Sequence, residues 1–261
     1  MANYSIISLY SGSKGNSVLI ESEDTRILID AGKSARALCS ALEGIGRKIS
    51  EIDAIFITHE HTDHTSALEI LLKKNRIPVH VVEVSARKMF LRGLWDYADV
   101  ICTHSPRYSV QVGNMLISSF DTPHDSDYSV GYRIAIGGDD EKTVIGYATD
   151  IGYVSDELKN ALRGCESVVL ECNHDLRMLM EGPYPYDLKL RIKSNRGHLS
   201  NSDCALFVSE LCSQGTRNIL LAHLSEENND PALAYGAVWN AITDESINLK
   251  VASQYEAVKL I

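Results

Sequence analysis

Short apolar runs separated by turn residues dominate the start of the chain. Residues 5–10, 18–20 and 26–29 are apolar and rich in β-branched side chains, which predicts three strands. Residues 34–45 instead carry Ala, Leu and Ile at helical spacing. The isoleucine-rich run 52–58 then predicts a fourth strand. The pattern therefore changes near residue 34 from strands alone to alternating strands and helices.

This alternation continues downstream. Thr65 is expected to cap a helix through residue 72, and Ser85 a second helix to about residue 97, with a strand over 78–84 between them. Residues 108–145 predict strands joined by turns, and Gly137–Asp140 gives the strongest hairpin signal. Further elements are predicted at 156–163, 174–181, 200–214 and 231–241 for helices, and at 167–170, 218–222 and, as a terminal strand pair, 249–261 for strands.

This order predicts an α/β fold with four layers, in which two mixed sheets are flanked by helices. No repeat and no Pro/Ser-rich linker divides the sequence, so residues 1–261 are expected to form a single domain. With 261 residues, 44% of them hydrophobic, the chain can bury a sizeable core.

Composition narrows the setting. No apolar run approaches the ~18 residues that span a bilayer, and no secretory signal is visible, so we expect a cytoplasmic protein without membrane contact. The cysteines at 39, 102, 165, 172, 204 and 212 form no Cys-x-x-Cys pair and are expected to be reduced, mostly buried thiols. The net charge of −10 argues against an indiscriminate polyanion binder but leaves room for a local basic channel.

Four potential metal ligands follow the isoleucine-rich strand directly: His59, His61, Asp63 and His64. Imidazole and carboxylate groups suit Zn²⁺, and also Mn²⁺ or Fe²⁺. On a turn at a strand end, His59 and His61 can face one ion while Asp63 and His64 face a second. A polar surface loop is the alternative, but this spacing at the mouth of a buried strand favours a metal centre.

The pattern His-x-His-x-Asp-His after a hydrophobic strand resembles the signature of the metallo-β-lactamase-fold hydrolases. The resemblance implies an αββα sandwich with a dinuclear centre between the sheets. It also implies three further ligands, and His124, Asp150 and His223 stand in matching settings. Taken alone, Asp150 has the alternative of capping a turn with Gly152, and His223 that of an ordinary loop residue.

By the same resemblance, two divalent ions are expected, with Zn²⁺ as the bound metal and Mn²⁺ or Fe²⁺ as alternatives. One ion would be held by His59, His61 and His124, the other by Asp63, His64 and His223, with Asp150 shared. Two such ions lower the pKa of a bound water, so that a metal-bound hydroxide is available at neutral pH.

Flanking strings narrow the resemblance. Ser-Gly-Ser-x-Gly-Asn16, Thr-Asp150-x-Gly-Tyr-Val-Ser, Glu171-x-Asn-His-Asp, Gly-His198-x-Ser-Asn and Ala-His223-Leu-Ser closely resemble the YycJ (WalJ) group of bacterial metallo-β-lactamase-fold proteins. This resemblance implies a phosphodiesterase that degrades double-stranded DNA from its ends as a 5′-to-3′ exonuclease, linked to mismatch repair. No inserted domain like that of the longer RNA-processing nucleases is visible.

Other side chains are candidates for catalysis and substrate binding. Besides Asp63, the candidates for a catalytic role, in proton transfer, are Asp125, His174 and His198. Candidates for contact with substrate phosphate are Ser13, Asn16, Asn173 and Ser200, together with the basic residues Lys189, Arg191, Lys193 and Arg196, which lie near two tyrosines. Each group also has a purely structural interpretation. Ser13 and Asn16 can belong to a hairpin turn, Ser200 can cap a helix, and the basic residues can form the solvated face of a helix. A second basic group, Arg87, Lys88 and Arg92, favours the solvated face.

Two other functions stay open. The same centre can hydrolyse a small molecule, such as a cyclic phosphodiester, a thioester or a lactam, and the acidic composition slightly favours this. A non-enzymatic regulatory module on a hydrolase fold is disfavoured because the ligand set is complete. DNA is the expected partner; the sequence does not identify protein partners.

Overall fold

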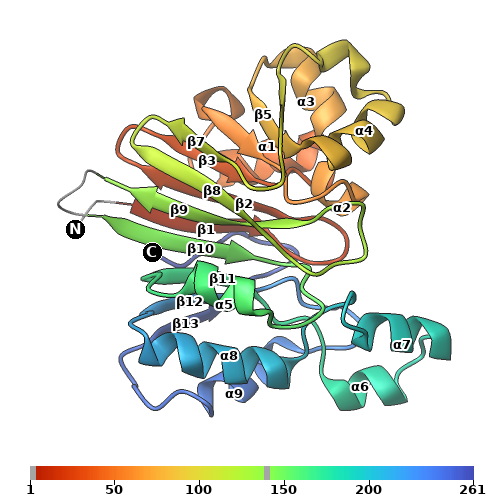
Figure 1. Cartoon of the computed structure of the whole chain (residues 1–261), viewed down its shortest axis with the longest axis vertical. Helices are drawn as coiled ribbons and strands as arrows, with labels where there is room; N and C mark the ends of the chain where they lie inside the picture. Colours follow the sequence, from red (N-terminus) through yellow and green to blue (C-terminus); the bar gives the residue numbers. More distant parts are fainter. Residues whose placement is uncertain (1–3, 138–141) are drawn as a thin grey trace.

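The computed structural model describes residues 4–137 and 142–261, and these form four layers in the order helices, sheet, sheet, helices (Figure 1). The predicted fold class is thereby confirmed. The first sheet has the strand order β14-β1-β2-β3-β4-β5-β6 and the second the order β13-β12-β11-β10-β9-β8-β7. Both sheets are mixed: β3 to β6 run parallel, as do β10 to β13, while the remaining pairs run antiparallel.

The strands have the following bounds. The first sheet contains β1 (Tyr4–Tyr10), β2 (Ser17–Ser22), β3 (Arg26–Ile29), β4 (Ala54–Phe56), β5 (Val79–Val82), β6 (Ile101–His104) and β14 (Val258–Lys259). The second contains β7 (Ser109–Val112), β8 (Met115–Asp121), β9 (Val130–Ile136), β10 (Thr143–Ala148), β11 (Ser167–Glu171), β12 (Asn218–Ala222) and β13 (Asn248–Val251).

Helices cover the outer faces of both sheets. On the first sheet lie α1 (Ala35–Gly44), α3 (Leu68–Lys74) and α4 (Glu83–Leu91), and on the second α5 (Asp156–Leu162), α8 (Asn201–Ser213) and α9 (Pro231–Trp239). The short α2 (Thr62–Thr65) follows β4, while α6 (Leu176–Glu181) and α7 (Tyr186–Lys193) project from the end of the second sheet (Figure 1). Two 3₁₀ turns, η1 (Ile49–Glu51) and η2 (Leu94–Tyr97), complete the described elements.

The core has three apolar layers, one between the sheets and one under each set of helices. Strand β3 shows how the sequence builds them: Ile27 and Ile29 pack between the sheets, and Leu28 packs under the helices. Because successive side chains of a strand point to opposite faces, a strand covered on both sides must be apolar throughout. That is why the strands of the parallel region were readable as continuous apolar runs.

The carboxyl ends of the parallel strands place acidic and histidine side chains at one edge of the sandwich. Asp30 and the segment from His59 follow β3 and β4, while Asp150 and His223 follow β10 and β12. Asp30, Asp150 and His223 adopt left-handed backbone conformations with φ of 62°, 57° and 56°. Non-glycine residues rarely adopt this region, and such strain concentrates at functional sites.

Two predicted helix caps were wrong. Thr65 ends α2, and its hydroxyl donates to the carbonyl of His61 at 2.9 Å instead of capping α3. Ser85 lies inside α4, buried, and its hydroxyl donates to the carbonyl of Tyr128. In both cases the hydroxyl donates to a backbone carbonyl and does not accept from an N–H in the first turn of the predicted helix. The predicted helix to residue 97 ends at Leu91, before Gly93 with φ of 109°.

The predicted terminal strand pair was also wrong. Strand β13 pairs parallel with β12, whereas β14 pairs antiparallel with β1 in the other sheet. Alternation indicates a strand but not its partner. Strand β6 and helix α7 were missed, because β6 is short and α7 carries mostly polar residues. Of the predicted hairpin turn Gly137–Asp140, residues 138–140 lie outside the described residues, but the flanking β9 and β10 pair antiparallel.

All six cysteines are free thiols, as predicted, and three of them, Cys165, Cys172 and Cys204, are buried. No helix in the described part of the chain is long and apolar enough to cross a membrane.

Candidate metal centre

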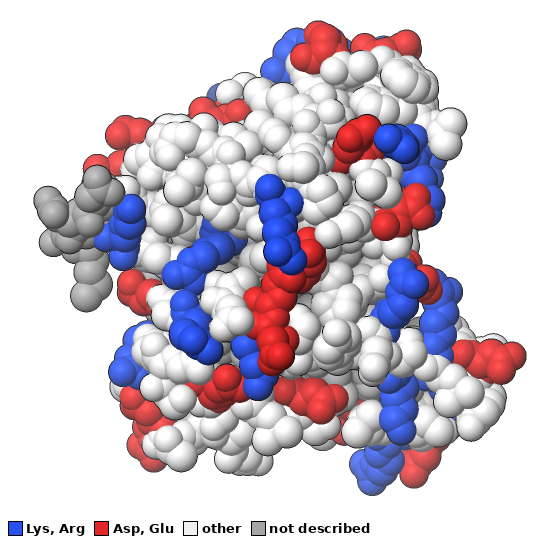
Figure 2. Space-filling model, viewed as in Figure 1, with Lys and Arg blue, Asp and Glu red and all other residues white. Residues whose placement is uncertain are grey.

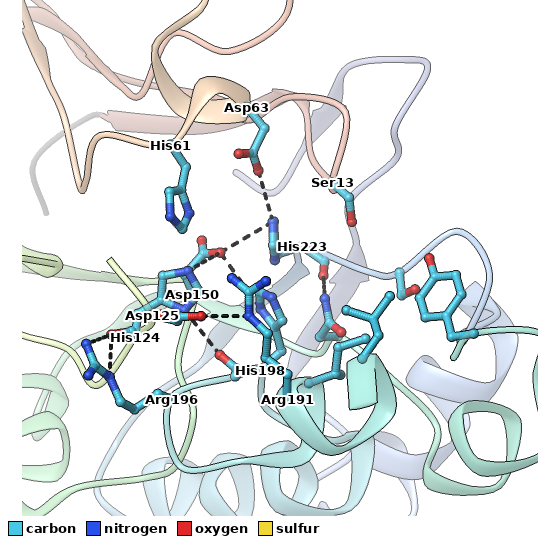
Figure 3. A pocket seen from close by; sticks show the side chains of 16 residues that line it. Ser13, His61, Asp63, His124, Asp125, Asp150, Arg191, Arg196, His198 and His223 are labelled. Atoms are coloured by element: carbon cyan, nitrogen blue, oxygen red, sulfur yellow. Dashed lines mark hydrogen bonds and ion pairs between the residues drawn. The ribbon is translucent and has the colours of Figure 1, made fainter. Parts of the chain in front are cut away.

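The predicted metal ligands converge at the edge where the two sheets meet. His61, Asp63, His124, Asp150 and His223 line a cleft of about 450 Å³, and His59 and His64 lie buried directly behind them. In Figure 3, His61 and Asp63 enter from one side of the cleft and His124, Asp150 and His223 from the other. Each sheet therefore supplies part of the centre.

One group consists of His59, His61 and His124, whose ring nitrogens lie within 4.8 Å of one another. The Nε2 of His59 and the Nδ1 of His61 are 2.9 Å apart, and the Nε2 of His124 is 3.7 Å from Asp150 Oδ1. Two ligands bonded at about 2.1 Å to one tetrahedral ion lie about 3.4 Å apart. The spacing of these nitrogens fits a shared ion.

The second group consists of Asp63, His64 and His223, also within 4.8 Å. The Nε2 of His64 lies 3.2 Å from Asp63 Oδ2 and 3.3 Å from Asp150 Oδ2, and the Nε2 of His223 lies 3.6 Å from both carboxylates. Asp150 thus stands between the two groups. Among the described residues, its Oδ2 and the Nε2 of His223 are buried without a hydrogen bond. Buried polar atoms are rarely left so, which fits a cation as the missing partner.

The opposite ring nitrogens are held by other groups. Asp30 Oδ2 lies 2.7 Å from Nδ1 of His64, and Glu171 Oε1 lies 2.9 Å from Nδ1 of His223. The carbonyl of Gly197 accepts from Nδ1 of His124 at 3.2 Å. Such contacts fix the orientation and tautomer of an imidazole and turn its Nε2 toward the other ligands of the candidate centre.

The protonation equilibria of the centre follow from its carboxylates. Burial alone would raise the pKa of Glu171, but His198 and His223 lower it to about 2. Burial alone would lower the pKa of His223, but Asp150 and Asp63 raise it to about 10. The ionised carboxylates create a negative potential that draws protons onto neighbouring imidazoles. Divalent cations can satisfy the same potential in place of those protons.

Asp30 and Glu171 were missed as site residues. Each is fully buried at the carboxyl end of a strand, β3 and β11. The signal was an acidic residue directly after an apolar run, residues 27–29 for Asp30 and residues 168–170 for Glu171. The string beginning at Glu171 was noted, but without a role for its carboxylate.

Two basic residues at the end of α4, Lys88 and Arg92, contact Glu60 within the predicted metal-binding segment. Lys88 Nζ lies 3.2 Å from the buried Glu60 carboxylate, and Arg92 donates to the Glu60 carbonyl at 2.6 Å. The same carboxylate accepts from the backbone N–H of Asp127 at 3.0 Å. Lys88 and Arg92 stay partly solvated, as expected, but they also contact Glu60. Arg87 pairs only with Glu83 in its own helix among the described contacts.

The candidates for proton transfer are placed differently from one another. His198 lines the cleft, with Nδ1 2.8 Å from Glu171 Oε1. Asp125 lines the cleft but accepts a hydrogen bond from Arg191 Nε at 2.6 Å, and Arg191 lowers its pKa despite the opposing effect of desolvation. His174 is buried outside the cleft lining, and burial lowers its pKa to about 4. The structure thus brings His198 and Asp125 to the cleft and leaves His174 behind it.

The polar candidates for phosphate contact divide in the same way. Ser13 and Asn173 line the cleft. Asn16 is buried, with its side-chain nitrogen 3.2 Å from His64 Nε2, and therefore supports the ligands. Ser200 caps α8 by accepting from the N–H of Asp203, so the helix-cap alternative is correct for it.

The four basic candidates for phosphate contact lie in different surroundings. Arg191 and Arg196 line the cleft. Lys189 instead donates to the Met180 carbonyl, and Lys193 lines a separate groove beside Tyr153. Figure 2 shows basic side chains over the region of α6 and α7, next to acidic ones. Of these four candidates for phosphate contact, the structure therefore brings only Arg191 and Arg196 to the cleft.

Comparison with known proteins agrees with this geometry. The model of the β-lactamase superfamily domain matches residues 25–224. The exodeoxyribonuclease YycJ of Bacillus anthracis is 32% identical over 250 residues, which cover 92% of this chain and 90% of that protein. The exodeoxyribonuclease WalJ of Streptococcus pneumoniae is 34% identical over 250 residues, covering 95% and 91%.

Solved structures show the same architecture. The metallo-β-lactamase fold protein YhfI from Bacillus subtilis superposes with a TM-score of 0.71 at 17% identity, covering 98% of this chain and 99% of that one. Zn²⁺-bound PqqB from Methylobacterium extorquens gives a TM-score of 0.73 at 15% identity, covering 97% and 99%. The chain therefore belongs to the β-lactamase superfamily, has the metallo-β-lactamase fold and is a metal-dependent hydrolase.

Proposed function

We propose that this protein is a dinuclear-metal-dependent phosphodiesterase that degrades double-stranded DNA from its 5′ ends. The observation that carries the proposal is a pair of three-residue groups of potential ligands at a cleft that Arg191 and Arg196 also line. Asp150 lies within 3.7 Å of a histidine nitrogen in each group. Similarity over about nine-tenths of two proteins named exodeoxyribonuclease supports DNA as the substrate.

In this proposal His59, His61 and His124 hold one ion, Asp63, His64 and His223 hold the other, and Asp150 serves both. The donor atoms suit Zn²⁺, and Mn²⁺ or Fe²⁺ is also compatible. When bound, two such ions supply hydroxide at neutral pH and neutralise charge that builds on a phosphate oxygen.

The surrounding side chains position the substrate and move protons. Arg191 and Arg196 offer positive charge to the phosphate backbone from the α7 side. Glu171 holds Nδ1 of His198, so Nε2 is the atom that can give a proton to the leaving oxygen. Ser13 also lines the cleft and can contact a phosphate, whereas Asn173 is buried and its side chain donates to the His223 carbonyl at 2.8 Å.

Cleavage of end-labelled duplex DNA tests the proposal. The metal-loaded protein should release mononucleotides from 5′-phosphorylated linear duplex and leave closed circular duplex intact. Asp63→Ala and His61→Ala should lose more than about 100-fold in rate while keeping the wild-type circular dichroism spectrum. Wild-type rates in either variant, or cleavage of closed circles, would contradict it.

A second function deserves the same assay. The cleft volume of about 450 Å³ falls within the range of about 300–1,000 Å³ seen for small-molecule sites. A cyclic phosphodiester, thioester or lactam is therefore the alternative substrate class. The salt dependence of the rate distinguishes the two substrate classes. Cleavage of DNA should slow steeply as the salt concentration rises, whereas turnover of a small substrate should not.

A role in mismatch repair is part of the proposal. A strain that lacks the protein should show a raised spontaneous mutation rate, restored by the wild-type gene but not by Asp63→Ala. An unchanged mutation rate would separate the nuclease activity from repair.

A further inference from the structure

The cleft has two walls of different chemistry. One wall carries the predicted metal ligands together with Ser13 and Ser225. The other comes from α7 and its flanks, where the half-exposed side chains of Tyr184, Leu188 and Ile192 stand beside Arg191. The apolar side chains can pack against a flat ring, and the neighbouring guanidinium can bind an anion. The wall is therefore complementary to a ligand that carries both groups.

The two arginines in the cleft are held to different degrees. Arg196 donates through Nε and Nη2 to the carbonyl of His124 and through Nη2 to that of Ser126, so its guanidinium is tied into the wall. Arg191 uses only Nε, toward Asp125, and within the described residues its two Nη groups make no hydrogen bond. In Figure 3 this pair spans the front of the cleft near His198.

The Arg191–Asp125 pair is easily exchanged. The side chains are 64% and 44% exposed, and exposed ion pairs contribute little to stability. A phosphate dianion offers more charge than one carboxylate and accepts two parallel N–H groups from a guanidinium. An arriving phosphate can therefore displace Asp125 at small cost.

The size of the cleft limits what enters. A volume of about 450 Å³ lies in the range of small-molecule sites and accommodates a single nucleotide. The space between the α7 wall and the metal centre therefore suits one terminal nucleotide at a time.

We infer that the α7 wall is a subsite for the terminal nucleotide, where Arg191 leaves Asp125 to bind the 5′-phosphate and Tyr184, Leu188 and Ile192 receive the base. This inference rests on the proposed exonuclease function and gives it a reason to start at phosphorylated ends. Arg191 is the residue that distinguishes a 5′-phosphate from a 5′-hydroxyl.

The ratio of kcat/KM on 5′-phosphorylated and 5′-hydroxyl duplexes, each labelled at the 3′ end, tests this role. The wild type should prefer the phosphorylated end by about 10- to 100-fold, and Arg191→Gln should abolish the preference. Asp125→Asn, which frees Arg191, should keep or increase it. Arg177→Gln, which removes an exposed charge from α6, is the matched control and should leave the ratio unchanged.

The base contact has a different signature. Tyr184→Ala should lower kcat/KM on both ends by the same factor, about 5- to 100-fold, and so leave the ratio unchanged. A wild type without end preference, or an Arg191→Gln variant that retains it, would overturn the assignment even though the protein cleaves DNA.

Calorimetry measures the affinity of the protein, as purified, for 5′-dAMP. This tests the subsite independently of DNA cleavage. Arg191→Gln should weaken binding at least about 10-fold, and deoxyadenosine, which lacks the phosphate, should bind the wild type as weakly as that variant binds 5′-dAMP. If the protein cleaves no DNA, the exonuclease proposal fails and this measurement still decides the subsite. Equal affinity of wild type and Arg191→Gln for 5′-dAMP would reject it.

Discussion

The Oδ2 atom of Asp30 lies 2.7 Å from Nδ1 of His64, across 34 positions of sequence, and neither side chain is exposed to solvent. The carboxylate also accepts from the backbone N–H of Thr58 at 2.9 Å, directly before the metal-binding segment. One buried acid thus fixes both the backbone and an imidazole of the candidate centre.

Removing this carboxylate should weaken metal binding without touching a ligand. We expect Asp30→Ala to lower metal affinity about 10- to 100-fold, because His64 loses the group that orients its ring. The free energy of unfolding should fall by about 3–5 kcal/mol, as when one partner of a buried ion pair is removed. Metal content after gel filtration and urea denaturation measure the two effects. Full metal occupancy in this variant would show that Asp30 has no orienting role.

Glu171 should matter more for the rate than for binding. It contacts Nδ1 of both His198 and His223. We expect Glu171→Gln to lower kcat by about 10²- to 10⁴-fold with a smaller change in KM, since proton transfer through His198 loses its orienting base. Glu210→Gln, on the surface of α8, provides the control. Equal losses in kcat for both variants would remove Glu171 from the mechanism.

Gly197 should tolerate no side chain. A Cβ placed there would lie 2.0 Å from the Ile192 carbonyl oxygen and 2.4 Å from that of Arg191, both backbone atoms. We expect Gly197→Ala to displace the carbonyl that holds His124 and to reduce metal retention and activity at least tenfold. Gly44→Ala, with open space around its Cβ at the end of α1, should be neutral or stabilising by up to about 1 kcal/mol. Normal metal content in Gly197→Ala would contradict the tight packing.

Acid sensitivity should depend partly on His80, which is not one of the candidate metal ligands. Burial, with a smaller effect of His104, lowers the pKa of His80 to about 4, whereas the unfolded chain titrates near 6.5. Protons then bind the unfolded state preferentially between about pH 6.5 and 4, so this contribution to stability is present above 6.5 and lost as the pH falls toward 4. His80→Phe, which can keep the stacking on Phe56, should lose less Tm than the wild type over this range. Parallel Tm curves for the two proteins would exclude this contribution.

Metal removal should lower thermal stability. At a free metal concentration 100 times Kd, binding adds about 2.7 kcal/mol to stability, which corresponds to a Tm shift of about 5–10 °C for a chain of this size. Dialysis against EDTA should produce that fall, and Zn²⁺ or Mn²⁺ should reverse it. The shift should largely vanish in His61→Ala. An EDTA-insensitive Tm in the wild type would argue against occupied sites.

The sequence was most informative where the chemistry is local. His59, His61, Asp63 and His64 follow one strand, so their spacing alone pointed to a metal. Asp150 and His223 have local alternatives as turn and loop residues, and only a resemblance singled them out.

Asp30 and Glu171 were missed because their partners are distant in sequence. His64 lies 34 positions from Asp30, and His223 lies 52 from Glu171. No local pattern records such a contact. The basic residues of α7 looked like one cluster in the sequence, and only the turn of the helix shows that Arg191 and Lys189 face different surroundings.

The path of the last strands has a consequence for how the molecule can be divided. The first sheet is complete through β6 except for β14, which the chain supplies after it has built the whole second sheet. A backbone cut in the connection between His104 and Ser109 would therefore leave two fragments that interlock, because the second contributes an edge strand to the sheet of the first. Neither fragment carries a full ligand set. Recovery of metal binding when separately produced fragments are mixed would therefore report their reassociation directly, in a split-protein experiment that requires no added tag.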